Sequence, residues 1–203
     1  MFTGLIREMG TVTSFQNNTL SLTAVHRPKL GDSIAINGAC LSVVGLQRRG
    51  FSVELSPETQ RHIAMERLRH HVHVEPAMIM GDRFEGHMVQ GHIDTIGTVE
   101  KIVNTGNSYD VFIQVAPEFI PLIVPKGSIA IDGVSLTVND VYSESFRLTI
   151  IPITMNETLF GSYTQGVRVN IETDMFARYM QHLLQHRQKT LSWDDISNIT
   201  ALY

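Results

Sequence analysis

Short runs of apolar and β-branched residues alternate with tight turns over most of the chain, which is typical of β structure. In the first half, this pattern predicts strands at residues 33–36, 39–46 and 51–55. Asn37-Gly38 separates the first two strands and is a strong hairpin signal, because both central turn positions need a positive φ. Arg49-Gly50 is predicted to close the next hairpin.

The chain contains a long internal repeat. Residues 31–43, GDSIAINGACLSV, align with residues 126–138, KGSIAIDGVSLTV, so that Asp132-Gly133 takes the place of the first hairpin turn. Shorter matches keep the same order, among them residues 4–6 with 91–93 and residues 72–75 with 169–172. The period of roughly 90 residues suits a small domain rather than a solenoid unit.

Two copies of one fold are therefore expected at residues 1–86 and 87–174, followed by a third segment at 175–203. About six short strands in each copy predict a small closed β-barrel. Pro57 occupies the position that proline favours at the start of a helix, so a short helix is expected there. Another short helix is expected over Pro117–Val124, between strands of the second copy.

The last segment changes its pattern from strand to helix. Asp174 is a candidate N-cap, and helical spacing follows at Phe176, Tyr179, Met180, Leu183 and Leu184. An amphipathic helix must bury its apolar stripe, either on a barrel or against other subunits.

Composition excludes several classes of protein. The chain has 203 residues, a net charge of −4 and 43% hydrophobic residues, which argues against a basic nucleic-acid binder and against a disordered chain. The single cysteine, Cys40, excludes an internal disulfide and a Cys-rich zinc site, and favours a reducing, cytoplasmic setting. No apolar run suggests a membrane span, and no nucleotide, cofactor or metal motif is found.

Polar residues recur at matched places in the two copies. Cys40 and Ser42 follow the first hairpin turn, and Ser135 and Thr137 follow the second. Each pair alternates along its strand and so shares one face. That face is either solvent-exposed or lines a ligand pocket at a barrel mouth.

Histidines and one lysine are further candidates. Three close histidines, His70, His71 and His73, could hold a metal, but a solvated sheet edge is the favoured interpretation. His87 and His92 flank the junction of the copies, where each could be an acid or base or a hydrogen-bonded structural residue. Lys126 has no basic counterpart, because Gly31 occupies its place in the first copy.

Five segments together resemble the riboflavin synthase family of the alpha-chain type: residues 1–6, 37–43, 86–94, 126–138 and 169–172. The resemblance extends over roughly residues 1–185 and includes the duplication. It implies an all-β fold of two tandem six-stranded Greek-key barrels with a C-terminal helix. It also implies a homotrimer assembled through the C-terminal helices, with lumazine synthase as a further partner.

The resemblance implies an enzyme that acts on two molecules of 6,7-dimethyl-8-ribityllumazine. One molecule would bind the N-terminal barrel and the other the C-terminal barrel of a neighbouring subunit. A four-carbon unit would pass between them, giving riboflavin and 5-amino-6-(D-ribitylamino)uracil in the last step of riboflavin biosynthesis. The reaction would need no cofactor and no metal.

The resemblance also assigns residues to the two sites. Catalysis is assigned to Ser33, Cys40 and His92 at the first barrel. Further substrate contacts expected there are Phe2, Thr3, Gly4, Leu5, Ile6, Leu41, Ser42, Glu54, Leu55, Ser56, Pro57, Glu58, Thr59, Gly91 and Ile93. Those expected at the second barrel are Lys126, Ser135, Leu136, Thr137, Ile151, Pro152, Ile153, Thr154, Met155, Asn156 and Asp174.

A few positions depart from the family's usual pattern. His73 stands where asparagine is common, Glu85 replaces a glycine, Ser42 replaces a threonine, and Ile153 replaces a polar residue. The main alternative function is a non-catalytic lumazine- or flavin-binding antenna protein, and another is an inert structural duplication. The presence of Ser33, Cys40, His92, Lys126 and Ser135 together favours the enzyme.

Overall fold

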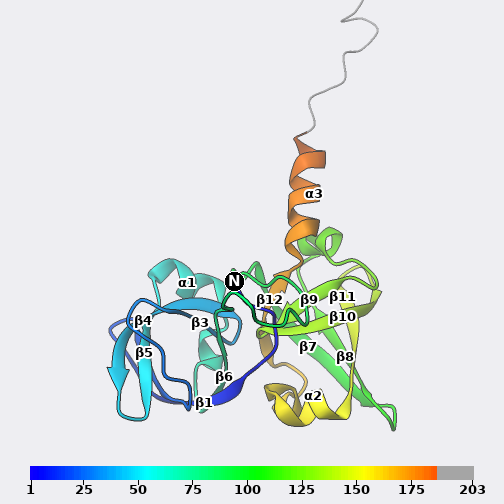
Figure 1. Ribbon diagram of the computed structural model, residues 1–203. Helices are drawn as coiled ribbons and strands as arrows, with labels where there is room; N and C mark the ends of the chain where they lie inside the picture. Colours follow the sequence, from blue (N-terminus) through cyan, green and yellow to red (C-terminus); the bar gives the residue numbers. More distant parts are fainter. Residues whose placement is uncertain (187–203) are drawn as a thin grey trace, which may run out of the picture.

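Two closed antiparallel barrels lie side by side in the computed structural model, which describes residues 1–186 (Figure 1). The first barrel has the strand order β1-β2-β5-β4-β3-β6, and the second barrel repeats that order with β7 to β12. The first set of strands is β1 (Glu8–Gln16), β2 (Thr19–Thr23), β3 (Ser33–Ile36), β4 (Ala39–Gln47), β5 (Gly50–Glu54) and β6 (His71–Pro76). The second is β7 (Thr95–Asn104), β8 (Tyr109–Gln114), β9 (Ser128–Ile131), β10 (Val134–Val141), β11 (Ser145–Ile150) and β12 (Arg168–Thr173). The two barrels confirm the duplication predicted from the repeat, and their strand order agrees with the Greek-key fold that the resemblance implies.

Short helical segments connect the strands of each barrel. They are α1 (Pro57–His62), η1 (Met65–Arg67), η2 (Pro117–Leu122), α2 (Pro152–Glu157) and η3 (Leu159–Ser162). The predicted helix from Pro57 is confirmed, and its N-cap Ser56 accepts a hydrogen bond from the Thr59 backbone N–H. The helix predicted over Pro117–Val124 is instead a 3₁₀ segment ending at Leu122. Pro121 inside it lacks the N–H that an α-helical turn needs.

The repeated hairpin turns have the predicted backbone conformation. Asn37 and Gly38 have φ values of 45° and 81°, and Asp132 and Gly133 have 44° and 84°. These pairs of positive φ values give the turn a twist that matches the twist of the strands. The Arg49-Gly50 prediction is displaced by one residue, because residues 48–49 form the turn and Gly50 opens β5.

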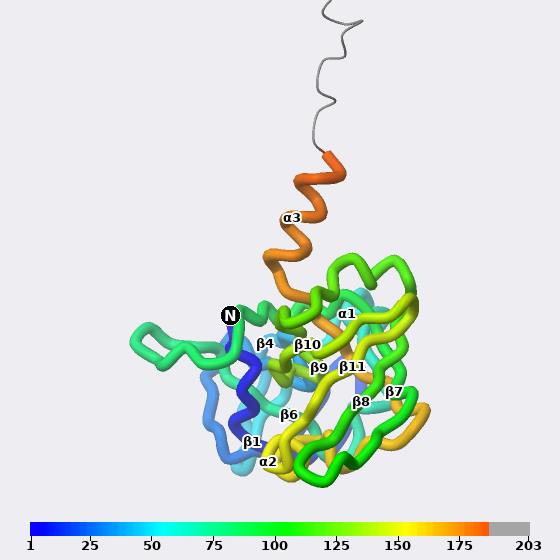
Figure 2. The backbone as a smooth tube through the Cα atoms, turned by 90° about the vertical axis from the view of Figure 1, so that its right-hand side faces the viewer, coloured from blue at the N-terminus to red at the C-terminus, as the bar shows by residue number. Residues whose placement is uncertain are grey.

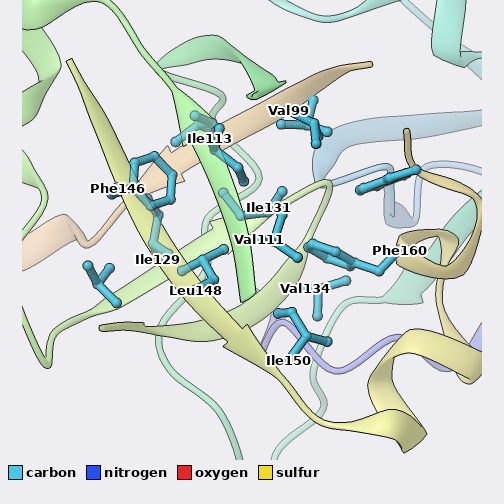
Figure 3. Close-up of a cluster of buried hydrophobic side chains, with 14 of the residues drawn as sticks. Val99, Val111, Ile113, Ile129, Ile131, Val134, Phe146, Leu148, Ile150 and Phe160 are labelled. Atoms are coloured by element: carbon cyan, nitrogen blue, oxygen red, sulfur yellow. The ribbon is translucent and has the colours of Figure 1, made fainter. Parts of the chain in front are cut away.

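Alternate side chains fill the interior of each barrel with apolar groups. Figure 3 shows this packing in the second barrel, where Val99, Val111, Ile113, Phe146 and Leu148 are all fully buried. Burying a side chain of this size stabilises the folded state by about 1.5–3 kcal/mol relative to leaving it exposed. The filled interiors leave ligand chemistry to the outer walls.

The two hairpin turns meet back to back at the junction of the barrels. A Cβ atom placed on Gly38 would lie only 2.6 Å from the backbone N of Gly133, and one placed on Gly133 would lie 2.8 Å from the N of Gly38. Only glycine permits backbones to approach this closely. Beside the turns, Phe2 and Val89 pack against Ala35 and Ala130 in a small buried cluster.

His73 and Asn170 make equivalent hydrogen bonds across this junction. Asn170 donates from Nδ2 to the Asn37 carbonyl at 2.9 Å and accepts at Oδ1 from the Ala64 N–H at 2.8 Å. His73 bonds through Nδ1 to the Asp132 carbonyl at 2.7 Å and accepts at Nε2 from the Leu159 N–H at 2.8 Å. The imidazole, with its proton on Nδ1, therefore offers one donor and one acceptor, as the asparagine amide does at the equivalent place.

The interpretation of the three clustered histidines as a solvated edge is wrong for His73. His70 and His71 are exposed, but His73 is only 1% exposed because it lies between the barrels. Burial lowers the pKa of His73 to about 4. Beside it, burial raises the pKa of Asp132 to about 6, although Tyr163 and the Asn170 N–H donate to this carboxylate.

Helix α3 (Met175–Gln185) begins at the second barrel and projects away from both barrels (Figures 1 and 2). Asp174 caps it as predicted, accepting from the Phe176 N–H at 2.8 Å. Its apolar side chains are not buried on the chain: Phe176, Tyr179, Met180, Leu183 and Leu184 are each 57–65% exposed. The predicted third segment extends to residue 203, but its part at 187–203 lies outside the described residues. In the part of the chain described, no helix is long and apolar enough to cross a membrane.

The substitution His73→Asn should remove an acid sensitivity from the fold. The unfolded chain binds a proton at His73 near pH 6.5, whereas the folded protein does so only near pH 4. The contribution of neutral His73 to the free energy of unfolding is therefore fully present above pH 6.5 and is lost as the pH falls toward 4. Between pH 7 and 4.5, wild type should lose about 2–3 kcal/mol more of its unfolding free energy than His73→Asn.

Urea denaturation at the two pH values measures this difference. Asp132 titrates in the opposite sense in the same range, but it is present in both proteins and cancels in the comparison. The exposed neighbour His71, changed to Asn, is the control and should behave as wild type. Parallel pH dependence in wild type and His73→Asn would contradict the assignment.

Candidate active site

The outer wall of the first barrel carries the polar residues singled out in the sequence. Strand β3 pairs with β4 so that Ser33 faces Ser42 and Ala35 faces Cys40. Leu41 and Val43 alternate with them and point into the core. Ser33, Cys40 and Ser42 therefore share the outer face of one hairpin rather than lining a barrel mouth.

A cavity of about 180 Å³ opens beside Cys40. The first barrel supplies one wall through Ala39, Cys40, Glu58, Thr59, His62 and Ile63. The segment that leads into the second barrel supplies the other wall through Gly91, His92 and Ile93. The fold thus brings Cys40 and His92 together from different copies of the repeat.

The segment that precedes each barrel, residues 1–6 or 88–93, packs against the opposite barrel. The Cys40 N–H donates to the Gly91 carbonyl at 2.8 Å, and the Ser135 N–H donates to the Gly4 carbonyl at 2.8 Å. The two segments also pair with each other through Phe2 and Val89. Gly4-Leu5-Ile6 was expected at the first barrel, but Gly4 lies on the second barrel and Ile6 packs against its core.

Glycine is required where each segment crosses the opposite barrel. Gly91 has a φ of 80°, and a Cβ there would lie 2.5 Å from the Cβ of Cys40. Gly4 has a φ of 78°, and a Cβ there would lie 2.6 Å from the Cβ of Ser135. Side chains at either position would push the segment away from the wall and displace His92 or Leu5.

Two buried carboxylates hold the segments in place. Glu172 accepts from the backbone N–H groups of Gln90, Gly91 and His92 at 2.7, 2.8 and 3.2 Å. Glu75 accepts from the N–H groups of Thr3 and Gly4 at 2.7 and 3.1 Å, and from the Thr3 hydroxyl. Burial raises the pKa of both carboxyls, whereas these donors favour their ionised forms. The position of His92 therefore depends on Glu172.

These carboxylates were not among the predicted site residues. Their signal was available in the repeat, since VHVE at 72–75 aligns with VNIE at 169–172. An acidic residue at the buried end of a strand in both copies indicates a charge with fixed partners. In the second barrel, Arg178 of α3 also forms ion pairs with Glu172 and Asp94, at 3.5 and 3.0 Å.

The second barrel presents a different set of groups on its equivalent wall. Ser135 takes the place of Cys40, and Leu5 takes the place of His92 by repeat position. Lys126 is exposed and has a φ of 67°, at the position that Gly31 occupies in the first copy with 85°. A lysine in this left-handed region is sterically costly, by roughly 1–2 kcal/mol.

Several predicted contact residues direct their side chains away from the outer walls. Leu41, Leu55 and Met155 are buried in the barrel cores, and Leu136 packs against the second core, so they could offer only backbone groups to a ligand. Phe2 is buried at the junction, and Thr3 is bound to Glu75. Ser33 borders a separate cavity of about 210 Å³.

The short helices place the remaining predicted residues at the rims. Glu58 and Thr59 of α1 line the Cys40 cavity, while Glu54, Ser56 and Pro57 are exposed beside it. On the second barrel, Thr154 of α2 corresponds to Thr59, and its exposed neighbours are Ile151, Pro152, Ile153 and Asn156. Thr137 is exposed on β10, as Ser42 is on β4.

His87, for which the sequence left both a catalytic and a structural role open, contacts Ser135. Its Nδ1 lies 2.7 Å from the Ser135 Oγ, and the side chain is 8% exposed. Burial lowers the pKa of His87, and the negative charge of Asp174 partly opposes this effect. Over residues 1–186, no three His, Cys, Asp or Glu side chains gather in a way that would hold a metal ion.

Comparison with known proteins agrees with the duplication. The lumazine binding domain family matches residues 3–77 and 90–174. Riboflavin synthase of Photobacterium phosphoreum is 37% identical over 212 residues, covering 96% of each chain. Riboflavin synthase of Actinobacillus pleuropneumoniae is 39% identical, covering 91% of this chain and 90% of that protein. The Bacillus subtilis (strain 168) enzyme is 37% identical with the same coverage.

Among solved structures, the fold resembles LumP in complex with 6,7-dimethyl-8-(1'-D-ribityl) lumazine. The TM-score is 0.75 at 20% identity, covering 85% of this chain and 99% of that chain. LumP in complex with riboflavin gives the same values. At this identity, the likeness concerns the fold.

Replacing Glu172 by Gln should loosen the segment that carries His92. The amide loses charge and part of its acceptor capacity toward three backbone N–H groups, which should cost about 1–3 kcal/mol. Hydrogen exchange is expected to become faster at the amides of Gln90, Gly91 and His92, with little change at Thr3 and Gly4. Glu75→Gln is the mirror control and should reverse this pattern. Equal effects of both variants on both segments would show that the carboxylates act only on global stability.

Proposed function

The chain belongs to the riboflavin synthase family of enzymes, and from this premise we propose that it converts two molecules of 6,7-dimethyl-8-ribityllumazine into riboflavin and 5-amino-6-(D-ribitylamino)uracil. This reaction is the last step of riboflavin biosynthesis. One molecule would be the donor of a four-carbon unit and the other its acceptor. No oxidant is consumed, because the two products together contain all the atoms of the two substrates.

The observation that carries the proposal is the inequality of the two outer walls. The first wall joins Cys40 to His92, whereas the second has Ser135 and Leu5 at the equivalent places. Two identical molecules must be treated differently in this reaction, since one loses a proton and the other receives an adduct. Two copies of a barrel with different polar groups meet that requirement.

The cavity beside Cys40 is suited to part of a site. At about 180 Å³ it is smaller than the roughly 300 Å³ or more of pockets that enclose a whole small-molecule ligand. We propose that a neighbouring subunit completes it, so that the first barrel of one chain faces the second barrel of another. The exposed apolar face of α3 would join three such chains.

Residues of the first wall would carry out the proton transfers of the reaction. His92 is exposed at the cavity rim, where its imidazole could take or return a proton at the C7 methyl group. Cys40 and Ser33 lie on the adjacent hairpin face and would polarise the ring system. Backbone groups of residues 40–42 and 54–59 would recognise the pyrimidine edge.

The second wall would hold the other molecule. Ser135 and Thr137 share the outer face of β10, and Lys126 lies at the start of the same motif. Thr154 and its neighbours in α2 would border the ring, and Asp174 would lie nearby at the start of α3. A cytoplasmic setting and association with lumazine synthase belong to this proposal as well.

A non-catalytic ligand-binding protein is the second candidate, since LumP has a similar fold. The two functions are distinguished by adding 6,7-dimethyl-8-ribityllumazine to the protein without any cofactor. An enzyme should form riboflavin, which is measured by its absorbance. It should also release an equal amount of 5-amino-6-(D-ribitylamino)uracil. Saturable binding without product at neutral pH would favour the binding protein.

The substitutions Cys40→Ser and His92→Ala should lower turnover while leaving the fold intact. Loss of a positioned acid or base costs about 10²–10⁴-fold in rate, so His92→Ala is expected to fall by about a hundredfold. Steady-state riboflavin formation and circular dichroism measure the two properties. His71→Ala, at an exposed position of β6, is the control and should retain full activity. Wild-type rates in both site variants would contradict the assigned roles.

Deleting the residues after Asp174 should dissociate the trimer. The apolar face removed consists of five side chains that are more than half exposed in the single chain. Sedimentation velocity should give a trimer for the full chain and a monomer for the truncated chain, with riboflavin formation lost in parallel. An unchanged oligomer would show that other surfaces hold the subunits together.

A further inference from the structure

His87 is placed to control the hydroxyl of Ser135. Its Nδ1 and the Ser135 Oγ are 2.7 Å apart, which is a normal hydrogen-bond length. The backbone beside it is anchored, because the His87 N–H donates to the Thr3 carbonyl at 3.1 Å. The ring therefore enters from the segment between the barrels and meets β10 from outside.

The other nitrogen of the ring determines the direction of this hydrogen bond. The His87 Nε2 is buried and has no partner among the described residues. A proton on Nε2 would be an orphaned buried N–H, which is rare in folded proteins. With the proton on Nδ1 instead, Nε2 retains only a lone pair, and His87 donates to the Ser135 oxygen. Burial lowers the pKa of His87, which favours the neutral ring with a single proton.

The direction matters for what Ser135 can do. If its oxygen accepts from His87, its own hydrogen is free to be donated elsewhere. Ser135 is half-buried on the outer face of β10, so that hydrogen can point toward a ligand on the second wall. With the opposite direction, the hydroxyl hydrogen would be used on the ring, and the wall would offer a ligand only an acceptor.

The first barrel has no such arrangement. Cys40 occupies the equivalent position, and its side chain makes no hydrogen bond within residues 1–186, although His92 borders the same cavity. His92 and His87 thus differ in their surroundings. The His92 ring is exposed at the first wall, whereas the His87 ring is buried at the second wall and hydrogen-bonded to a hydroxyl.

We propose that His87 is a positioning residue that directs the Ser135 hydroxyl hydrogen toward the substrate on the second barrel. The inference rests on the proposed function for the identity of that substrate. His87 acts through Ser135 and does not itself touch the reacting molecule. The donated hydrogen bond would stabilise charge that develops on the ring during the four-carbon transfer.

Two substitutions separate this role from packing. In His87→Asn, the side-chain NH₂ lies close to where Nδ1 was and can still donate to Ser135, whereas His87→Leu retains bulk without a donor. We expect kcat of His87→Leu to fall about tenfold or more, with the Kd for riboflavin changed less than about threefold, and His87→Asn to recover most of kcat. His71→Leu is the exposed control and should match wild type. Equal losses in the Asn and Leu variants, or no loss in either, would overturn the proposal.

The direction of the hydrogen bond is tested without turnover. In the full chain labelled with ¹⁵N-histidine, NMR should show the His87 proton on Nδ1, and Ser135→Ala should shift that signal while the His71 signal stays in place. A proton on Nε2, or no shift in Ser135→Ala, would overturn the inference. Absence of riboflavin formation in wild type would instead refute the proposed function, and the NMR result would still decide whether His87 donates to Ser135.

Discussion

The close contact of two hairpin turns is the constraint on which the rest of the structure depends. Gly38 and Gly133 meet with no room for a side chain, so the backbones of the two turns fix the distance between the barrels at this point. Beside these turns, His73 and Asn170 each reach from a strand of their own barrel to the opposite barrel, where they bond backbone groups of its hairpin turn and of a nearby helical segment. These buried hydrogen bonds are directional and leave little freedom for one barrel to rotate against the other.

That geometry places the preceding segments where they can serve the opposite barrel. Residues 1–6 cross to Ser135 and residues 88–93 cross to Cys40, each held from its own barrel by a buried glutamate. The candidate site is therefore assembled from both copies, although each barrel has a complete core of its own. Substitutions at the junction should affect the site without touching it.

Much of the fold could be predicted because the signals are local. Alternation and the Asn-Gly and Asp-Gly turns identify the strands and the hairpins, since each depends on neighbouring residues, and the repeat shows the same signals again in the second half of the chain. The placement of Gly4 on the second barrel could not be predicted in this way, because it follows from contacts more than a hundred residues apart. His73 was misjudged for the same reason: the nearby His70 and His71 are exposed, whereas His73 is buried where it contacts the other barrel. Pro121 was a local signal that the helix prediction overlooked.

The site was predictable only in part. The resemblance assigned Cys40 and His92 to the first barrel, and the fold places both at one cavity there, but it assigned residues 4–6 to that barrel as well, whereas Gly4 lies on the second barrel. The pairing of His87 with Ser135 has no sequence signature, because nothing in the spacing indicates that the segment at 86–89 lies on β10. Symmetry at the level of the backbone thus coexists with asymmetry in the side chains, and the proposed chemistry needs both.

The inequality of the two walls can be measured by calorimetric titration of the wild-type protein with riboflavin. Unequal walls should give two classes of site per chain with clearly different affinities, of which only one weakens in His92→Ala. Two identical sites per chain, or a uniform loss of affinity in that variant, would contradict it.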